Sequence, residues 1–302
     1  MSYIEFNKIT KIFSEKNGIS NIDLKIEKGE TLGIIGINGA GKTTLIRHLM
    51  GFVKQNSGKV TVAGLDPWKD AAILKDKIAY IPGEIGFPLL PTGDSFLKAQ
   101  SQLEGVNNLS KSRTIAKDLA LDTRAKLKTM SKGMKQKTAI VSAFIRDKEI
   151  LIFDEPTTGL DPLMRDTFIE LINNEKAKGK TIIFSTHIFL EAERCCDNVI
   201  FIDSGKIIDR INIEKLVHNE NKLYRLGFAS PLELTKFTKE NKICKIHKQK
   251  DDSLQIIVTV PNAQIQKFIK YLTRFKLKFF SEIKHSLAHK FKEAFAPRKE
   301  QS

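Results

Sequence analysis

Short apolar runs alternate with longer segments of mixed polarity along the first two thirds of the chain. Apolar runs rich in isoleucine and valine are typical of strands, and apolar residues recurring every three or four positions are typical of helices. The pattern predicts strands at residues 3–6, 22–26, 31–35, 60–62, 78–81, 150–153, 181–185 and 199–203. It predicts helices at residues 42–50, 94–103, 111–121, 132–146, 162–178 and 188–195.

The last four of these strands have apolar residues at nearly every position, which is typical of strands buried on both faces. Strands of this kind, separated by helices, predict an α/β domain with a mostly parallel sheet. A turn at residues 204–208 reads as a closing hairpin, and the composition changes just after it. We therefore place a domain boundary at residue 210.

The remaining segment, residues 211–302, shows a different order of elements. Strands are predicted at residues 223–228, 243–248, 254–260 and 277–283, with helices at residues 231–238, 263–275 and 286–295. Without the last helix this order is β-α-β-β-α-β, which is the ferredoxin-like pattern. The sequence thus predicts a small α+β domain after the α/β domain.

Composition indicates the cellular compartment of the protein. Hydrophobic residues make up 41% and charged residues 28% of the 302 positions, as in a soluble globular protein. The longest apolar runs are far shorter than a membrane span, and the start MSYIEFNK is not a signal peptide. The 3 cysteines, two of them adjacent, form no disulfide framework. We expect a chain of the reducing cytoplasm.

The net charge of +15 is unevenly distributed. Residues 211–302 contain 19 lysine and arginine residues and 9 acidic residues, whereas residues 1–210 contain 31 and 26. A basic segment of this kind favours anionic lipid or nucleic acid as a partner. The alternative is an ordinary solvated surface in a lysine-rich protein.

The candidate chemistry begins at GINGAGKTT, residues 36–44, which fits G-x-x-x-x-G-K-[ST]. The motif lies between a predicted strand and a predicted helix, where backbone N–H groups and the helix dipole form an anion site. Lys42 would reach the β- and γ-phosphates, and Thr43 would offer its hydroxyl to Mg²⁺. The residues expected around the phosphates are Gly36, Asn38, Gly39, Ala40, Gly41, Lys42, Thr43 and Thr44.

Two acids end the apolar strand ILIF, Asp154 and Glu155. Acids in such a place are costly unless a cation or a reaction uses them. Asp154 would hold Mg²⁺ through water, and Glu155 would polarise the water that attacks the phosphate. The Asn-Lys-x-Asp motif of small GTPases is absent from the sequence.

Three further motifs accompany this pair: SKGMKQ at residues 131–136, PTTGLDP at residues 156–162, and His187 at the end of the next strand. In this order and spacing the chain resembles, over residues 3–210, the ATP-binding subunits of ABC transporters. The sequence Pro82-Gly83-Glu84 resembles that of the family branch that pairs with ABC-2-type exporter permeases. The resemblance implies a P-loop NTPase fold with an antiparallel β subdomain and a helical subdomain at about residues 84–146.

In that family two nucleotide domains pair head to tail and enclose two ATP molecules. The resemblance implies that Ser131 and Gly133 contact the γ-phosphate held by the opposite subunit, although the usual LSGGQ is replaced by MSKGMKQ. It implies that His187 contacts the γ-phosphate in its own subunit and that Asp161 links the two sites. Phe13 matches the aromatic residue that stacks on adenine, with a core residue of the first strand pair as the alternative.

One position departs from the family pattern. Gly83 stands where a glutamine that contacts Mg²⁺ is expected. We hypothesise that Glu84 takes over this contact, because a carboxylate is also a hard oxygen ligand. Residues 85–102 would form the groove for a permease helix, through Phe87, Leu89, Leu90 and Phe96, or these residues pack within the helical subdomain.

We therefore predict an ATP-hydrolysing subunit that energises a separate membrane permease for export of a peptide, drug, lipid or ion. It would work as a homodimer or with a similar partner, at the inner face of the cell membrane, with its C-terminal domain against anionic lipid headgroups. The alternative is a soluble ATP switch acting on nucleic acid or the ribosome. Family members of that kind carry two nucleotide domains or a long coiled coil, and this sequence has neither, which argues against nucleic acid.

Overall fold

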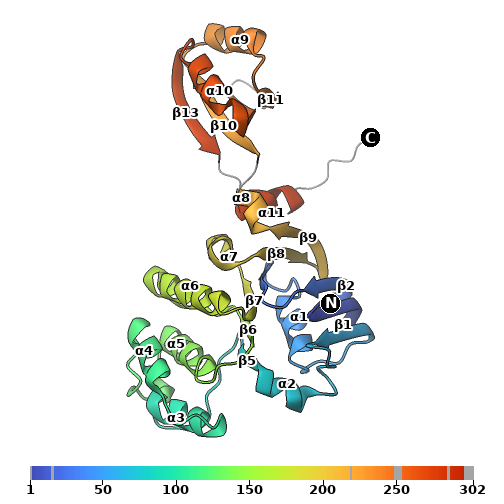
Figure 1. The fold of residues 1–302 in the computed structure, drawn as a ribbon, viewed down its shortest axis with the longest axis vertical. Helices are drawn as coiled ribbons and strands as arrows, with labels where there is room; N and C mark the ends of the chain where they lie inside the picture. Colours follow the sequence, from blue (N-terminus) through green and yellow to red (C-terminus); the bar gives the residue numbers. More distant parts are fainter. Residues whose placement is uncertain (1, 15–16, 218–219, 248–253, 284–285, 296–302) are drawn as a thin grey trace. The chain divides into compact units, whose positions relative to one another are not determined.

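The computed structural model describes residues 2–14, 17–217, 220–247, 254–283 and 286–295. The chain divides into two compact units, Met1–Ile213 and Glu214–Ser302, and each is treated separately. Figure 1 shows the elements of both units in the colours of the sequence. Within the described part of the chain, no helix is long and apolar enough to cross a membrane.

The first unit is built on a six-stranded sheet with the order β5-β6-β7-β3-β8-β9. Neighbouring strands are parallel from β5 to β8, and only β9 runs antiparallel to its neighbour. Every residue of β3, β6 and β7 is buried, which agrees with the continuous apolar runs in their sequences. The strands are β3 (Thr31–Ile35), β5 (Ile78–Ile81), β6 (Ile150–Asp154), β7 (Thr181–Thr186), β8 (Asn198–Asp203) and β9 (Lys206–Asn212).

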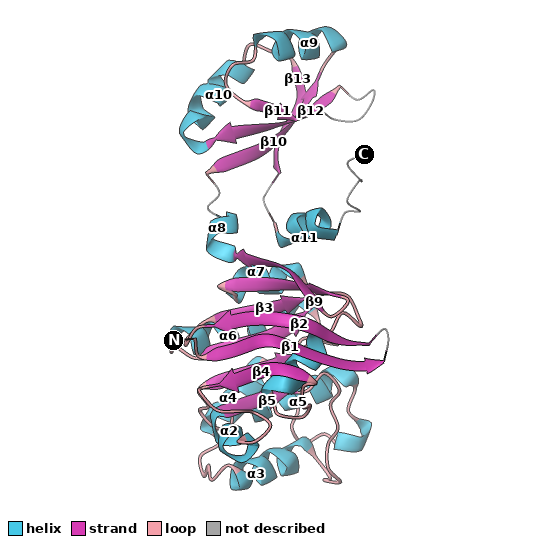
Figure 2. Cartoon of the chain, turned by 90° about the vertical axis from the view of Figure 1, so that its right-hand side faces the viewer, coloured by secondary structure: helices cyan, strands magenta, loops and turns pink. Residues whose placement is uncertain are grey.

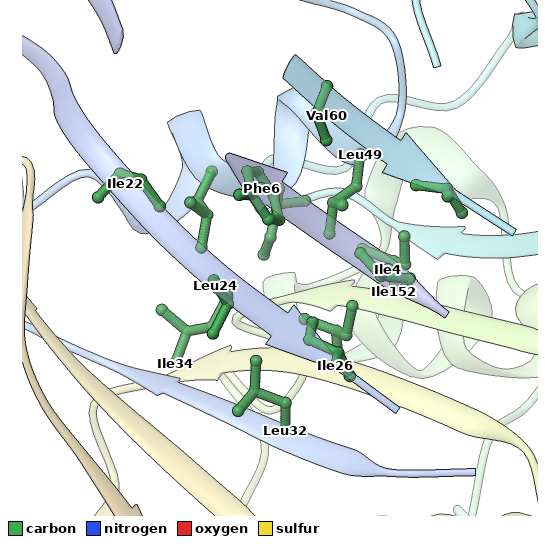
Figure 3. Packing of buried hydrophobic residues seen from close by; sticks show 14 of the residues in the cluster. Ile4, Phe6, Ile22, Leu24, Ile26, Leu32, Ile34, Leu49, Val60 and Ile152 are labelled. Atoms are coloured by element: carbon green, nitrogen blue, oxygen red, sulfur yellow. The ribbon is translucent and has the colours of Figure 1, made fainter. Parts of the chain in front are cut away.

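A second, antiparallel sheet of three strands has the order β2-β1-β4. Its strands are β1 (Ile4–Ser14), β2 (Asn17–Ile26) and β4 (Ser57–Val62), so β1 is much longer than the predicted strand at residues 3–6. The register of β1 shifts after Phe6, which lets pairing with β2 continue through polar sequence as far as Ser14. Figure 3 shows how side chains of both sheets and of α1 pack into one core.

Helices surround the six-stranded sheet. Helices α3, α4 and α5 lie together at one end of the unit, where α5 contacts both of the others (Figure 1). Helix α5 ends at Ala143, three residues short of the predicted end at residue 146. The helices are α1 (Lys42–Leu49), α2 (Ala71–Lys77), α3 (Gly93–Leu103), α4 (Ser110–Asp118), α5 (Lys132–Ala143), α6 (Pro162–Ala177) and α7 (Phe189–Cys195).

The second unit contains a four-stranded antiparallel sheet with the order β11-β12-β10-β13. Helices α9 and α10 cover one face of this sheet, as Figure 2 shows, and Phe228, Phe237 and Phe268 are fully buried between them. The elements are α8 (Ile213–Val217), β10 (Asn221–Phe228), α9 (Pro231–Glu240), β11 (Lys245–His247), β12 (Gln255–Pro261), α10 (Ile265–Leu272), β13 (Leu277–Ile283) and α11 (Leu287–Phe295). Residue 248, the predicted end of one strand, lies outside the described residues.

Candidate functional site

The phosphate-binding motif forms the turn between β3 and α1. A side chain at Gly36 would bring its Cβ within 2.4 Å of the Ile202 carbonyl oxygen, and Gly41, at the start of α1, has a left-handed φ of 111°. Both positions therefore require glycine. The Lys42 ammonium is buried and donates to the carbonyl oxygens of Gly36 at 2.9 Å and Ile37 at 3.2 Å. The backbone thus holds this cation at the mouth of the turn.

A cavity of about 510 Å³ lies over this turn. Phe13, at the far end of β1, lines it with a side chain that is 55% exposed, so it is not a core residue. An exposed aromatic face beside a phosphate-binding turn suits the stacking of a base. The residues around the cavity are Phe13, Asn17, Gly18, Asn38, Gly39, Gly41, Lys42, Thr43, Thr44, Arg47 and Glu155.

The carboxylate of Asp154 ends β6 and is 1% exposed. The Ser185 hydroxyl, on the neighbouring strand β7, donates to Asp154 Oδ1 at 2.6 Å and accepts from the Glu155 N–H at 2.9 Å. Asp154 Oδ2 is buried and has no hydrogen-bond partner. A buried carboxylate oxygen without a partner is costly, so this oxygen is available for a cation or its bound water.

Glu155 has a left-handed φ of 48°, a strained conformation for a residue with a side chain. This turn places Oε1 3.2 Å from Lys42 Nζ and Oε2 3.7 Å from Nδ1 of His187, which follows β7. The Thr158 hydroxyl also donates to Oε2, at 3.4 Å. The structure thus brings together the three residues for which the sequence predicts catalytic roles.

The remaining predicted residues do not line this cavity. Ser131 begins α5, and its hydroxyl accepts from the Met134 N–H at 3.2 Å. A Cβ at Gly133 would lie 2.7 Å from the Gly159 carbonyl oxygen, so only glycine allows this approach. Asp161 begins α6 and accepts from the Met164 N–H at 3.0 Å.

The position of the missing glutamine faces the buried carboxylate of Asp154 directly. A Cβ at Gly83 would lie 3.1 Å from Asp154 Oδ2, the oxygen without a partner. The neighbouring Glu84 is exposed and lines a separate pocket of about 340 Å³ with Lys132, Lys135 and others. With glycine at position 83, this sequence has no side chain there to contact Asp154 or a ligand of Asp154.

The proposed permease groove coincides in part with a cavity of about 300 Å³ beside β5 and α5. Phe87 and Phe96 line it, with ring centroids 4.8 Å apart in an edge-to-face arrangement. Phe96 is buried, whereas Leu89 is fully exposed, and Leu90 is half-buried. The two rings therefore pack within the helical layer while also facing the cavity.

Sequence reasoning missed several residues of the site. Ser185 was predicted only as the end of a strand, and Gln136 only as part of a motif. The Gln136 amide is buried and donates to the Pro156 carbonyl oxygen at 2.7 Å, which ties α5 to the loop after Glu155. Asn17, Gly18 and Arg47 also line the cavity. The sequence carries no signal for Ser185, because Asp154 and Glu155 are its neighbours only in the folded sheet.

The donor set fits the predicted ligands. Inward backbone N–H groups and a buried ammonium suit a triphosphate, while a hydroxyl at Thr43 and a carboxylate at Asp154 are hard oxygen ligands that suit Mg²⁺. A strand, this turn and a helix, together with an acid at the end of the buried strand β6, which β7 separates from β3, define a P-loop nucleotide hydrolase.

Comparisons with known proteins identify the family. The family model described as ABC transporter matches residues 19–158. The chain is 38% identical over 208 residues to the ABC transporter ATP-binding protein NatA of Bacillus subtilis, an alignment that covers 67% of this chain and 85% of NatA. It is 34% identical to the linearmycin resistance ATP-binding protein LnrL of Bacillus subtilis, covering 68% of each. The chain belongs to the ABC transporter ATP-binding proteins and is an ATPase of that family.

Other relatives and solved structures agree with this assignment. The chain is 32% identical to the Nod factor export ATP-binding protein I of Rhizobium etli, covering 69% of this chain and 67% of that protein. A solved ATP-binding subunit of an ABC transporter matches with a TM-score of 0.64 and 29% identity, over 71% of this chain and 92% of the other. A bacterial ABC transporter cassette solved as a dimer has the same fold, with a TM-score of 0.61 and 23% identity.

Proposed function

We propose that this chain energises a separate membrane permease for export, by hydrolysing ATP at a site that two subunits share. The observation that supports this most directly is the position of the Glu155 carboxylate, between Lys42 and His187 at the edge of the cavity. An acid there can orient and polarise a water molecule against a phosphate held by the turn.

Each residue has a specific role in this proposal. The backbone of residues 36–44 and Lys42 hold the phosphates, and Phe13 stacks on the base. Glu155 accepts the proton of the attacking water, and His187 helps to orient that water. When bound at Thr43 and Asp154, Mg²⁺ would neutralise charge on the phosphate oxygens.

Ser131, Gly133 and Asp161 lie outside the chain's own cavity, and we assign them to the site of a second subunit. The N-terminus of α5 can donate N–H groups to a phosphate without adding a side-chain charge. Two copies arranged about a twofold axis would then complete two equivalent sites. The second subunit is another copy of this chain or a similar chain.

We also propose that Glu84, the residue after Gly83, replaces the absent glutamine as a contact for Mg²⁺, because its carboxylate is a hard oxygen ligand. Replacing Glu84 with alanine should then raise the Mg²⁺ concentration needed for hydrolysis. An unchanged requirement for Mg²⁺ in the Glu84→Ala variant would exclude this role.

The direction of transport is inferred from relatives. The linearmycin resistance protein LnrL and the Nod factor export protein I are among the proteins to which this chain is similar. A peptide, drug, lipid or ion is compatible as cargo, since the permease would select it. The subunit would then lie at the inner face of the cell membrane.

The second unit is assigned to an accessory role. Its element order and its sheet order, β11-β12-β10-β13, support a ferredoxin-like domain at residues 211–302, distinct from the ATP-binding domain at residues 1–210. Its excess of lysine and arginine supports contact with anionic lipid.

The Glu155→Gln variant tests the shared site. Glutamine keeps the shape of the side chain but cannot accept a proton, so turnover should fall by about 10²-fold or more while ATP binding persists. The variant should then accumulate as an ATP-bound dimer that elutes earlier from gel filtration than the nucleotide-free chain. ATP-dependent binding to RNA or ribosomes, without dimerisation, would instead favour the soluble switch.

A further inference from the structure

The outer surface of the helices in the second unit carries an unusual set of side chains. Helices α9 and α10 lie side by side, with the Phe237 ring centroid 5.8 Å from that of Tyr271 and 5.3 Å from that of Phe275. Because both helices bury their apolar sides on the same face of the sheet, their other sides face outward together. We call this outward side the helix-layer surface.

Cations follow the outward side of α10. Lys267 and Lys270 are three residues apart on one side of α10, and Arg274 follows in the turn after the helix. All three are exposed, whereas Phe268 and Leu272 on the opposite side of the helix are buried. Arg274 forms an ion pair with Glu240 at 3.1 Å, while Lys267 and Lys270 have no acidic partner among the described residues.

The outward side of α9 carries further cations. Leu232, Lys236 and Lys239 are spaced by four and three residues and lie opposite the buried Phe237. Lys236 lies over the Phe275 ring, with its ammonium 5.7 Å from the ring centroid. Lys239 is exposed and has no acidic partner in the described part of the chain.

Apolar side chains project beside these cations. Leu232 is 78% exposed and Ile269 is 48% exposed, although both lie on helices with well-formed buried sides. Exposed leucine and isoleucine next to long cationic side chains are typical of surfaces that lie in the headgroup region of a bilayer. Lysine stems cover apolar area there while their ammonium groups reach the phosphates.

We propose that the helix-layer surface binds the anionic headgroups of a lipid bilayer. The charge is complementary to acidic lipid, and the exposed Leu232 and Ile269 suit the boundary between headgroups and acyl chains. The aromatic residues of the two helices are buried or half-buried, so the surface offers no ring on which nucleic-acid bases could stack. This inference deepens the proposed function by naming the lipid-binding surface, and it does not involve the ATP site.

The opposite face of the same sheet provides a matched control. Arg225 on β10 and Lys245 on β11 are exposed, and their register pairs them with Ile257 and Thr259 of β12, away from the helices. The double variant Lys267→Gln/Lys270→Gln and the double variant Arg225→Gln/Lys245→Gln remove the same charge from the two faces. All four positions are exposed, so both variants should fold as the wild type does, as circular dichroism would verify.

Sedimentation of the full chain with vesicles tests the proposal. The wild type should bind vesicles that contain phosphatidylglycerol, bind phosphatidylcholine vesicles weakly, and lose binding as salt is raised. The helix-layer variant should bind the acidic vesicles about tenfold more weakly, and the sheet-face variant less than about twofold. Equal losses in the two variants, or tighter binding to polyuridylate RNA than to acidic vesicles, would overturn the proposal.

The same variants separate this proposal from the proposed function. Because the helix-layer surface is remote in sequence from the ATP-binding motifs, Lys267→Gln/Lys270→Gln should hydrolyse ATP in solution at the wild-type rate. Loss of vesicle binding with normal hydrolysis supports the lipid-binding role of the helix-layer surface independently of the proposed function. Vesicle binding that survives in Glu155→Gln shows that lipid contact does not depend on turnover.

Discussion

At the scale of single residues, the site depends on one hydroxyl group that the sequence does not single out. Ser185 donates to Asp154 Oδ1 and accepts from the Glu155 N–H, so it orients both acids at once. It is fully buried, and water cannot replace it in either bond. The strained turn at Glu155 is supported by this contact.

The Ser185→Ala variant tests this role. It leaves the Asp154 oxygen and the Glu155 N–H without partners, which should lower the free energy of unfolding by about 1–3 kcal/mol. Hydrolysis should fall further than stability alone explains, because Glu155 is no longer held toward the cavity. Urea unfolding and steady-state hydrolysis at saturating ATP measure the two effects.

Ser142 in α5 provides the control, because its half-buried side chain makes no contact with the acids. Ser142→Ala should change the free energy of unfolding by less than about 0.5 kcal/mol and leave hydrolysis unaltered. If the two serine variants behave alike, Ser185 does not position the acids.

The phosphate-binding turn could be predicted because its signal is local. A strand, a glycine-rich turn and a helix follow one another in sequence, and the turn's own backbone forms the site. Ser185 and Gln136 could not be predicted, since each acts on a residue that is distant in sequence and adjacent only in the folded sheet or loop. Their roles depend on the order of β6 and β7 and on the approach of α5 to Gly159.

At the scale of elements, strand ends were predicted well where burial determines them, and also at the exposed β13 (Leu277–Ile283). The strands of the parallel sheet are apolar throughout and were predicted nearly to the residue, as β3 shows. The predicted strand at residues 3–6 was too short, because the second half of β1 is mostly exposed and is held by backbone pairing with β2 as far as Ser14. That extension brings Phe13 to the cavity. The position of Phe13 was therefore predicted from the family resemblance and not from the strand pattern.

A buried carboxylate connects two helices of the first unit. Glu175 of α6 is 1% exposed and forms ion pairs with Lys111 of α4 at 3.2 Å and Lys178 at 2.7 Å, as well as with Lys180. Burial favours the neutral acid, but the bonds from Lys178 and Lys180 outweigh it and lower the pKa of Glu175 to about 2.

This shift predicts a pH dependence of stability. The pKa of Glu175 in the folded protein lies below its ordinary value of 4.5, so its contribution to stability is complete above about pH 4.5 and is lost as the pH falls toward 2. Wild type should therefore lose stability over this interval more steeply than Glu175→Gln, in urea unfolding at stepped pH. Glu170→Gln on the exposed side of α6 should keep the wild-type slope. Parallel curves for wild type and Glu175→Gln would show that the ion pairs with the three lysines do not lower the pKa of Glu175.

At the scale of the whole molecule, the proposed ATP site is divided between two separate parts of the first unit. The cavity over residues 36–44 holds the phosphate-binding groups and Glu155, while Ser131 and Gly133 begin a helix that does not line it. The second part contacts the loop after Glu155, because Gly133 closely approaches Gly159 and Gln136 donates to the Pro156 carbonyl oxygen. Both parts are formed within one subunit, but neither completes the other there. Two subunits can therefore pair so that each supplies the part that the other's site lacks.

Mixing two inactive variants tests this arrangement. Lys42→Ala disables the phosphate-binding part and Ser131→Arg disables the part offered to the partner, so a dimer of either variant has no intact site. In a mixed dimer one site carries both changes and the other carries neither. Random pairing makes half of the dimers mixed, so an equimolar mixture should recover about a quarter of the wild-type hydrolysis if the two sites act independently. The recovered rate should rise and fall with the fraction of mixed dimers, which can be measured by giving the two variants different tags.

A control for subunit exchange alone mixes a single variant that carries both changes with the inactive Glu155→Gln variant. This mixture should recover nothing, because every site in it contains at least one change. No recovery in the first mixture despite verified mixed dimers, or full activity of Ser131→Arg alone, would mean that each chain completes its own site.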